Sequence, residues 1–198
     1  MLVLEWRMKW LRNSSKITVQ HITLVALLVT LQIVLANITQ IPLLGKQYNV
    51  GFLPIAYAGW LMGAPAAIVI GGLGDFIGAH LFPQGAYFPG FTFTNLLVGF
   101  VYGKMLYKKN IKWSNIAITT LITSSLYLFL NSLWLMMLYT SKGYWEWVAI
   151  RSLSYIFEYP AYTVISYFVL LRFSKMPSSN LKLARNLDFS GGSNEQQK

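Results

Sequence analysis

The sequence predicts an all-α integral membrane protein with six transmembrane helices. Apolar residues make up 55% of its 198 residues and charged residues only 11%, and the mean hydropathy is +0.48. Such values are improbable for a soluble domain of this size. Several apolar runs approach or exceed the roughly 20 residues that cross about 30 Å of hydrocarbon. We therefore expect one compact multi-span bundle.

The predicted spans are residues 17–37, 51–63, 65–81, 91–107, 114–140 and 147–173. The second and third are short for a membrane crossing. The sequence Gly63-Ala64-Pro65 between them fits either a kink in one helix or a tight turn between two. The local sequence leaves this choice open, and the charge pattern decides it.

Clusters of basic residues indicate which loops face the cytoplasm. One cluster precedes the first span and another follows the fourth: Arg7, Lys9, Arg12 and Lys16, and then Lys104, Lys108, Lys109 and Lys112. Both clusters are expected inside. An even number of crossings must separate them, so residues 51–81 must form two spans. The last span then also ends inside, before Lys175. We expect both termini to be cytoplasmic.

The chain divides into three segments. Residues 1–16 form a basic segment that is expected to be cytoplasmic or to lie along the membrane surface. Residues 17–175 form the six-helix membrane domain. Residues 176–198 are polar and are expected to be a disordered cytoplasmic tail.

Composition excludes several classes of function. The net charge of +10 is concentrated beside apolar segments, which is a topology signal and not a nucleic-acid footprint. The chain has no cysteine, so thiolate metal sites and cysteine nucleophiles are excluded. His21 and His80 are predicted near opposite membrane faces, so no catalytic triad can be assembled. No metal-ligand spacing and no complete P-loop occur, and we expect no enzyme activity, metal or cofactor.

Glycines recur four residues apart in the central spans. The three pairs are Gly59 and Gly63, Gly74 and Gly78, and Gly99 and Gly103. Such pairs allow close approach of helix backbones. We interpret them as internal packing surfaces, with contact to a partner subunit as the alternative.

Charged side chains inside the spans are candidate binding groups, because an unpaired charge in the membrane costs a few kcal/mol. Asp75 lies in the third span. In the last span, one helical face carries Arg151, Tyr155, Glu158 and Tyr162. This face should point inward. Ligand contacts and a purely structural network both remain open for these groups. Trp147 fits either an aromatic belt at the membrane surface or a pocket wall.

Five stretches of the chain are then recognisable together. They read GFLPI (51–55), GAP (63–65), GDFIG (74–78), YFPGFT (87–92) and GFVYG (99–103). In combination they resemble the folate-specific S component of energy-coupling factor (ECF) transporters. The resemblance implies a six-helix subunit of a bacterial plasma membrane that captures folate outside and docks on a T component driven by two ATPases.

The resemblance also implies roles for individual segments. The loop 39–50 corresponds to a lid over the substrate, with Lys46, Gln47 and Tyr48 within it. The loop 84–91, QGAYFPGF, corresponds to a segment that lines the site. Ala26 and Thr30 are the nearest match to the small residues with which the family meets the T component.

Folate chemistry fits the candidate residues. Its flat rings call for aromatic faces, and its glutamate tail calls for a cation. We expect Asp75 or Glu158 to accept hydrogen bonds from the pteridine and Arg151 to bind a tail carboxylate. The candidate substrate-binding residues are Phe52, Asp75, His80, Tyr87, Phe88, Pro89, Gly90, Phe91, Trp147, Arg151, Tyr155 and Glu158.

Three other functions remain as alternatives. The fold could serve another vitamin, because fold does not determine the ligand. An integral-membrane enzyme could use Asp75, His80 and Glu158 as acids and bases. An assembly factor could use the glycine faces to bind a partner.

Overall fold

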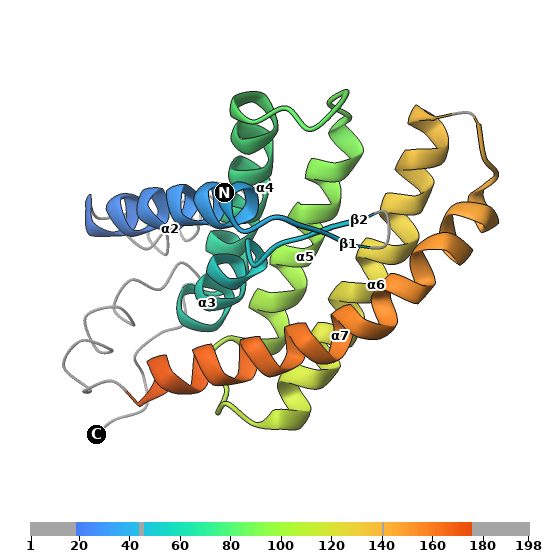
Figure 1. Ribbon diagram of the computed structural model, residues 1–198. Coiled ribbons are helices and arrows are strands. Elements are labelled where there is room, and N and C mark those ends of the chain that lie inside the picture. The colour runs from blue at the N-terminus through green and yellow to red at the C-terminus, as the bar shows by residue number, and fades with distance from the viewer. Residues whose placement is uncertain (1–18, 44–45, 140, 176–198) are drawn as a thin grey trace, which may run out of the picture.

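Six helices arranged as one bundle form the part of the chain that the structure, a computed structural model, describes: residues 19–43, 46–139 and 141–175 (Figure 1). The helices are α2 (Val19–Ile38), α3 (Phe52–Met62), α4 (Ala64–Leu81), α5 (Pro89–Leu106), α6 (Trp113–Leu138) and α7 (Tyr144–Ser174). Every helix matches one predicted span to within three residues at each end. The predictions for residues 1–16 and 176–198 lie outside the described residues.

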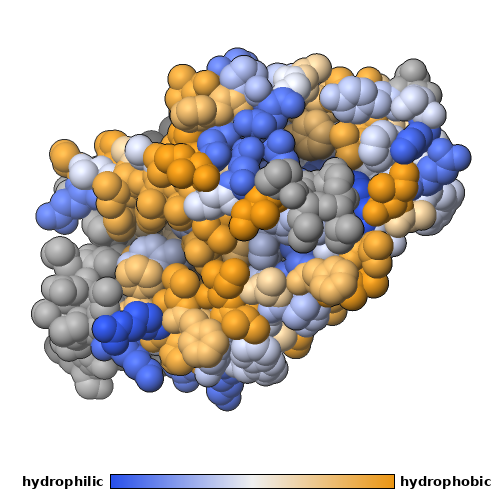
Figure 2. Space-filling view, in the orientation of Figure 1, coloured by the Kyte–Doolittle hydropathy of each residue, from blue (hydrophilic) through white to orange (hydrophobic). Residues whose placement is uncertain are grey.

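The helices differ in how well they fit a membrane crossing. By length and composition, α2, α4 and α6 are long and apolar enough to cross a bilayer. Large apolar side chains are exposed on the outside of the bundle, among them Leu27 (64%), Phe157 (61%) and Phe168 (63%). Figure 2 shows many hydrophobic residues on one face, with hydrophilic residues among them. This is the surface expected of a protein that lipid surrounds. The number of crossings and the orientation of the termini stay predictions.

Residues 51–81 form two helices, as the charge pattern predicts. Helix α3 ends at Met62, and Gly63 has φ +89°, which L-amino acids with side chains rarely adopt. Helix α4 begins at the next residue, with Pro65 in its first turn, where a missing N–H has no cost. Gly63-Ala64-Pro65 is therefore a turn and not a kink.

Helix α3 has 11 residues, or about 16 Å of helix, and protein covers both of its ends. At the end that we predict to be cytoplasmic, the Lys108 N–H donates to the Trp60 carbonyl at 3.1 Å. The Trp60 indole donates in return to the Lys109 carbonyl at 3.1 Å. The turn after α5 thus satisfies a helix end that lipid could not.

The glycine pairs are internal packing surfaces, as we interpreted them. A Cβ atom on Gly59 would lie 2.8 Å from the Gly103 backbone, and one on Gly99 would lie 2.4 Å from the Ala67 carbonyl oxygen. In α4, Gly74 lies beneath the side chain of Gln32 from α2. The backbones of α3, α4 and α5 are in direct contact, and α2 packs onto the same unit.

The loop after α2 is a two-stranded antiparallel hairpin, which the sequence did not predict. Strand β1 (Ile41–Leu43) pairs with β2 (Lys46–Tyr48), with Ile41 opposite Tyr48. Two contacts join the hairpin to α7. The Tyr48 hydroxyl donates to the Ser154 carbonyl at 3.1 Å, and the Tyr162 hydroxyl donates to the Asn49 carbonyl at 2.8 Å. Backbone pairing thus supplements an otherwise helical fold.

Candidate substrate-binding site

A cavity of about 640 Å³ lies among α2, the hairpin and α3 to α7. This volume is within the range of about 300–1,000 Å³ that is common for small-molecule pockets. The loop between α4 and α5 and the hairpin both contribute to its wall, and the exposed side chains of Gln47 and Gln84 join them at 3.3 Å. The cavity therefore lies at the end of the bundle that we predict to face outward.

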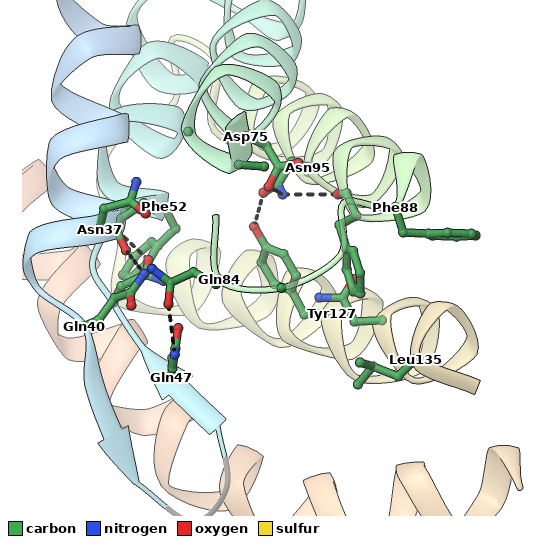
Figure 3. Close-up of a pocket in the computed structure, with 18 of the residues that line it drawn as sticks. Asn37, Gln40, Gln47, Phe52, Asp75, Gln84, Phe88, Asn95, Tyr127 and Leu135 are labelled. Atoms are coloured by element: carbon green, nitrogen blue, oxygen red, sulfur yellow. Dashed lines mark hydrogen bonds between the residues drawn. The ribbon is translucent and has the colours of Figure 1, made fainter. Parts of the chain in front are cut away.

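Asp75 is held by hydrogen bonds on the wall of this cavity (Figure 3). Its Oδ2 accepts from the Thr92 hydroxyl at 2.6 Å, and its Oδ1 accepts from the Asn95 amide at 2.9 Å. The Tyr127 hydroxyl donates to Asn95 Oδ1 at 2.7 Å and so fixes the orientation of that amide. A carboxylate has about four acceptor positions, so Asp75 can still accept from a ligand.

Helix α7 presents one continuous stripe to the cavity. The predicted face of Arg151, Tyr155, Glu158 and Tyr162 lines the cavity, which confirms that it points inward. Trp147 also lines the cavity. Glu158 is only 3% exposed. The Nε of Arg151 and the indole N of Trp147 are buried and have no hydrogen-bond partner within the described ranges. The stripe therefore offers donors to a ligand as well as a carboxylate.

Aromatic rings form two further parts of the wall. Phe52 stacks on Tyr162 with a centroid distance of 4.2 Å. Phe88 lies 5.7 Å from Trp134 and 6.3 Å from Phe91, measured between centroids. A flat ligand would meet ring faces on both the α3 side and the α5 side of the cavity.

Gly90 supports the site without lining it. A Cβ atom at this position would lie 2.4 Å from the Trp134 indole and 2.6 Å from the Phe88 ring. Trp134 also donates from its indole N to the Thr94 hydroxyl at 2.9 Å. The glycine thus allows Trp134 to pack against the start of α5, where Pro89 is the first helical residue.

Most of the predicted site residues lie on the cavity wall. Those that do are Phe52, Asp75, Tyr87, Phe88, Phe91, Trp147, Arg151, Tyr155, Glu158 and, from the hairpin, Gln47. Their roles in binding stay predictions.

Other predicted residues lie outside the wall. Pro89, Gly90, Tyr48 and His80 are not among the lining residues. His80 is exposed, its Nδ1 lies 2.7 Å from the Phe76 carbonyl oxygen, and its ring lies 4.8 Å from that of Tyr87. For Lys46 the structure describes only the backbone.

Ala26 and Thr30 are exposed on α2, with the Thr30 hydroxyl bonded to the Ala26 carbonyl at 2.9 Å. They are accessible to a partner, but their contact with a T component stays a prediction.

Sequence reasoning missed the amide side chains of the cavity. These are Gln32, Asn37, Gln40, Asn49, Gln84, Asn95 and Asn131. Gln32 is 4% exposed, and its Oε1 has no hydrogen-bond partner among the residues described. An amide inside an apolar span was the available signal, because polar groups in the membrane usually face the bundle interior.

Comparison with known proteins identifies the family. A family model described as "ECF transporter, substrate-specific component" matches residues 20–177. The chain belongs to the family of ECF transporter S components. This family consists of substrate-binding transporter subunits and not of enzymes, and the chain is therefore a multi-pass membrane protein.

The chain is also similar to individual folate transporters. The chain is 29% identical to the folate transporter FolT of Clostridium novyi (strain NT) over 143 residues, which are 72% of this chain and 83% of the relative. It is 27% identical over 161 residues to FolT of Leuconostoc mesenteroides, covering 78% and 86%. A solved structure, "Crystal structure of FolT bound with folic acid", has a TM-score of 0.71 and 25% identity, and covers 77% of this chain and 93% of that one.

Proposed function

We propose that this S component binds folate at the outer side of the plasma membrane and delivers it by docking on a T component with two ATPases. The observation that carries the proposal is the composition of one cavity. A hydrogen-bonded carboxylate, facing aromatic rings and an arginine line the same 640 Å³ space. Both curated relatives are folate transporters, which supports the same ligand.

The proposed pose follows from donor and acceptor types. The pteridine ring carries an amino group and a ring N–H, which need acceptors, and Asp75 has acceptor positions left after bonding Thr92 and Asn95. The tail carboxylates need donors, and a guanidinium binds a carboxylate through two parallel bonds. Arg151 is placed on the same wall. The pteridine therefore lies toward α4 and α5, and the tail lies toward the start of α7.

Intrinsic fluorescence tests the ligand, because the chain has seven tryptophans. The purified protein in detergent is titrated with folic acid, riboflavin, thiamin and biotin. We expect tight, saturable quenching by folic acid alone. Tighter binding of another vitamin would transfer the assignment to that ligand. Absence of saturable binding to all four would contradict the proposal.

The proposed topology has six crossings with both termini inside. The absence of cysteine allows single cysteines to report on each side. Ser141→Cys is expected to react with a membrane-impermeant maleimide in intact cells, because the loop between α6 and α7 is placed outside. Asn110→Cys, in the loop between α5 and α6, is expected to react only after permeabilisation. The reverse labelling pattern would refute this orientation.

A further inference from the structure

Lys142 lies beside the cavity although it does not line it. It belongs to the loop between α6 and α7, and its Nζ is 5.3 Å from the centroid of the Trp147 ring. This distance is within the about 6 Å over which a cation and an aromatic face attract each other. Trp147 itself lines the cavity. The lysine ammonium therefore contacts a residue that lines the space that we assign to the ligand.

The neighbouring groups on α7 are also donors. The indole N of Trp147 and the Nε of Arg151 are both buried and lack a hydrogen-bond partner in the described part of the chain. The two residues are four positions apart, or about 6 Å along the helix axis. Indole, guanidinium and ammonium groups donate and do not accept. The start of α7 thus offers three donor groups that suit acceptor-only groups such as carboxylates. The one carboxylate in its first turn, Glu146, already accepts from the Gly143 N–H at 3.2 Å.

The cavity wall carries more acidic than basic side chains among those that the structure describes. Asp75 and Glu158 line it together with Arg151, so two acidic side chains and one basic one lie on the wall within the described part of the chain. Folate with one glutamate carries two carboxylates, and each further γ-linked glutamate adds one more negative charge. Arg151 can bind one carboxylate. The acidic residues repel the other carboxylates, and a cation near the rim would attract them.

We propose that Lys142 and Trp147 form an outer subsite for the distal carboxylates of the glutamate tail. The inference rests on the proposed function and extends it to a ligand class, the pteroyl-γ-glutamates. The Trp147 ring supports the aliphatic part of the tail, and the Lys142 ammonium binds the carboxylates beyond the one at Arg151. Lys142 is exposed, so this contact weakens as salt concentration rises. The subsite makes affinity depend on tail length.

The test compares three ligands that share the pteroyl group: pteroic acid without glutamate, folic acid and pteroyltriglutamate. Their dissociation constants are measured by calorimetry on the purified full chain and on Lys142→Gln, at low and at high salt. At low salt we expect Lys142→Gln to weaken pteroyltriglutamate about fivefold and folic acid about twofold to threefold. Pteroic acid binding is expected to stay unchanged. High salt should reduce the differences between the two proteins.

Two further variants control for charge and for folding. Lys175→Gln makes the same charge change after the other end of α7 and is expected to bind all three ligands like the wild type. Lys142→Arg keeps the cation and is expected to restore the preference for the longer tail. Equal weakening of all three ligands by Lys142→Gln, or no weakening of any, would overturn the subsite. Failure of the wild type to bind folic acid would instead overturn the proposed function, and the subsite with it.

Discussion

Two halves of the bundle pack by different means. Between α3, α4 and α5, backbones touch directly: a Cβ atom would lie 2.6 Å from the Asn95 carbonyl oxygen at Gly71 and 2.2 Å from the Ala64 Cα at Gly103. Helices α6 and α7 instead bury many hydroxyl side chains. These are Thr119, Thr120, Thr123, Ser124 and Ser132 on α6 and Ser154, Thr163 and Ser166 on α7.

The difference matters because lipid supplies no hydrophobic driving force between helices. The glycine half gains its stability from close van der Waals contact, which leaves no room for a side chain. The glycine half carries Asp75, the acceptor of the site, and Asn95, which donates a hydrogen bond to it. The hydroxyl half and the hairpin attached to it carry Arg151 and Gln47. We infer that the first half is a fixed platform and that the second half tolerates change.

The largest expected effect is Gly99→Val. Its Cβ position is 2.4 Å from the Ala67 carbonyl oxygen, and a backbone atom cannot move aside as a flexible side chain can. We expect destabilisation of about 3 kcal/mol or more and little monodisperse protein. Gly143→Ala is the control, because nothing lies within 4 Å of its Cβ position. The measurement is the melting temperature in detergent. A wild-type melting temperature for Gly99→Val would contradict the inference that the glycine half is a fixed platform.

Asp75→Asn tests the acceptor that the platform holds. Asparagine replaces one carboxylate oxygen by an NH2 group. This donor would face Thr92 or Asn95, which are themselves donors to Asp75. We expect folic acid binding to weaken about 100-fold, or about 2.7 kcal/mol. The melting temperature without ligand should change by only a few degrees. Unchanged folic acid affinity would remove Asp75 from the proposed pose.

Arg151→Ala tests the cation of the second half. Loss of the charge-assisted contact to a tail carboxylate is expected to weaken folic acid binding more than tenfold, or by more than about 1.4 kcal/mol. The protein should still fold, because Arg151 lines the cavity and is not among the buried core residues. Arg172→Ala, in the last turn of the same helix, is the control. Equal affinities of the two variants would reject the role of Arg151.

Gln47→Ala tests the contact between the hairpin and the loop after α4. The exposed amides of Gln47 and Gln84 are 3.3 Å apart, and one exposed neutral hydrogen bond contributes little. We expect folic acid to dissociate about twofold to threefold faster, as measured by stopped-flow fluorescence, with its association rate nearly unchanged. A dissociation rate equal to that of the wild type would show that this contact does not retain the ligand.

The smallest expected effect is Ser166→Ala. The side chain is 1% exposed, and its Oγ has no hydrogen-bond partner in the described ranges. Removing such a hydroxyl is expected to leave stability unchanged or to raise it by less than about 0.5 kcal/mol, because no hydrogen bond is lost. Comparison of its melting temperature with that of Gly99→Val measures the contrast between the halves. A similar fall in melting temperature in both variants would contradict the proposed difference between the two halves.

The helices and the main charged residues of the site were predictable because their signals are local. An apolar run must be helical in lipid, since its backbone groups have no other partners. A spacing of three or four residues places Arg151, Tyr155 and Glu158 on one face without any tertiary information. The turn at Gly63 followed from counting charges, which also requires no structure.

What the sequence alone determined is therefore the class of protein, the bounds of its helices and the face of α7 that points inward. Only the tertiary structure decided which side chains meet. The Asn95 amide donates to Asp75 because Tyr127, on another helix, donates to the Asn95 Oδ1 and so fixes the orientation of the amide. Gly90 supports the site because the Trp134 indole, 44 residues further along the chain, occupies the position that a Cβ atom would take. The hairpin depends on pairing and on contacts with α7. These contacts join residues far apart in the chain, and periodicity carries no information about them.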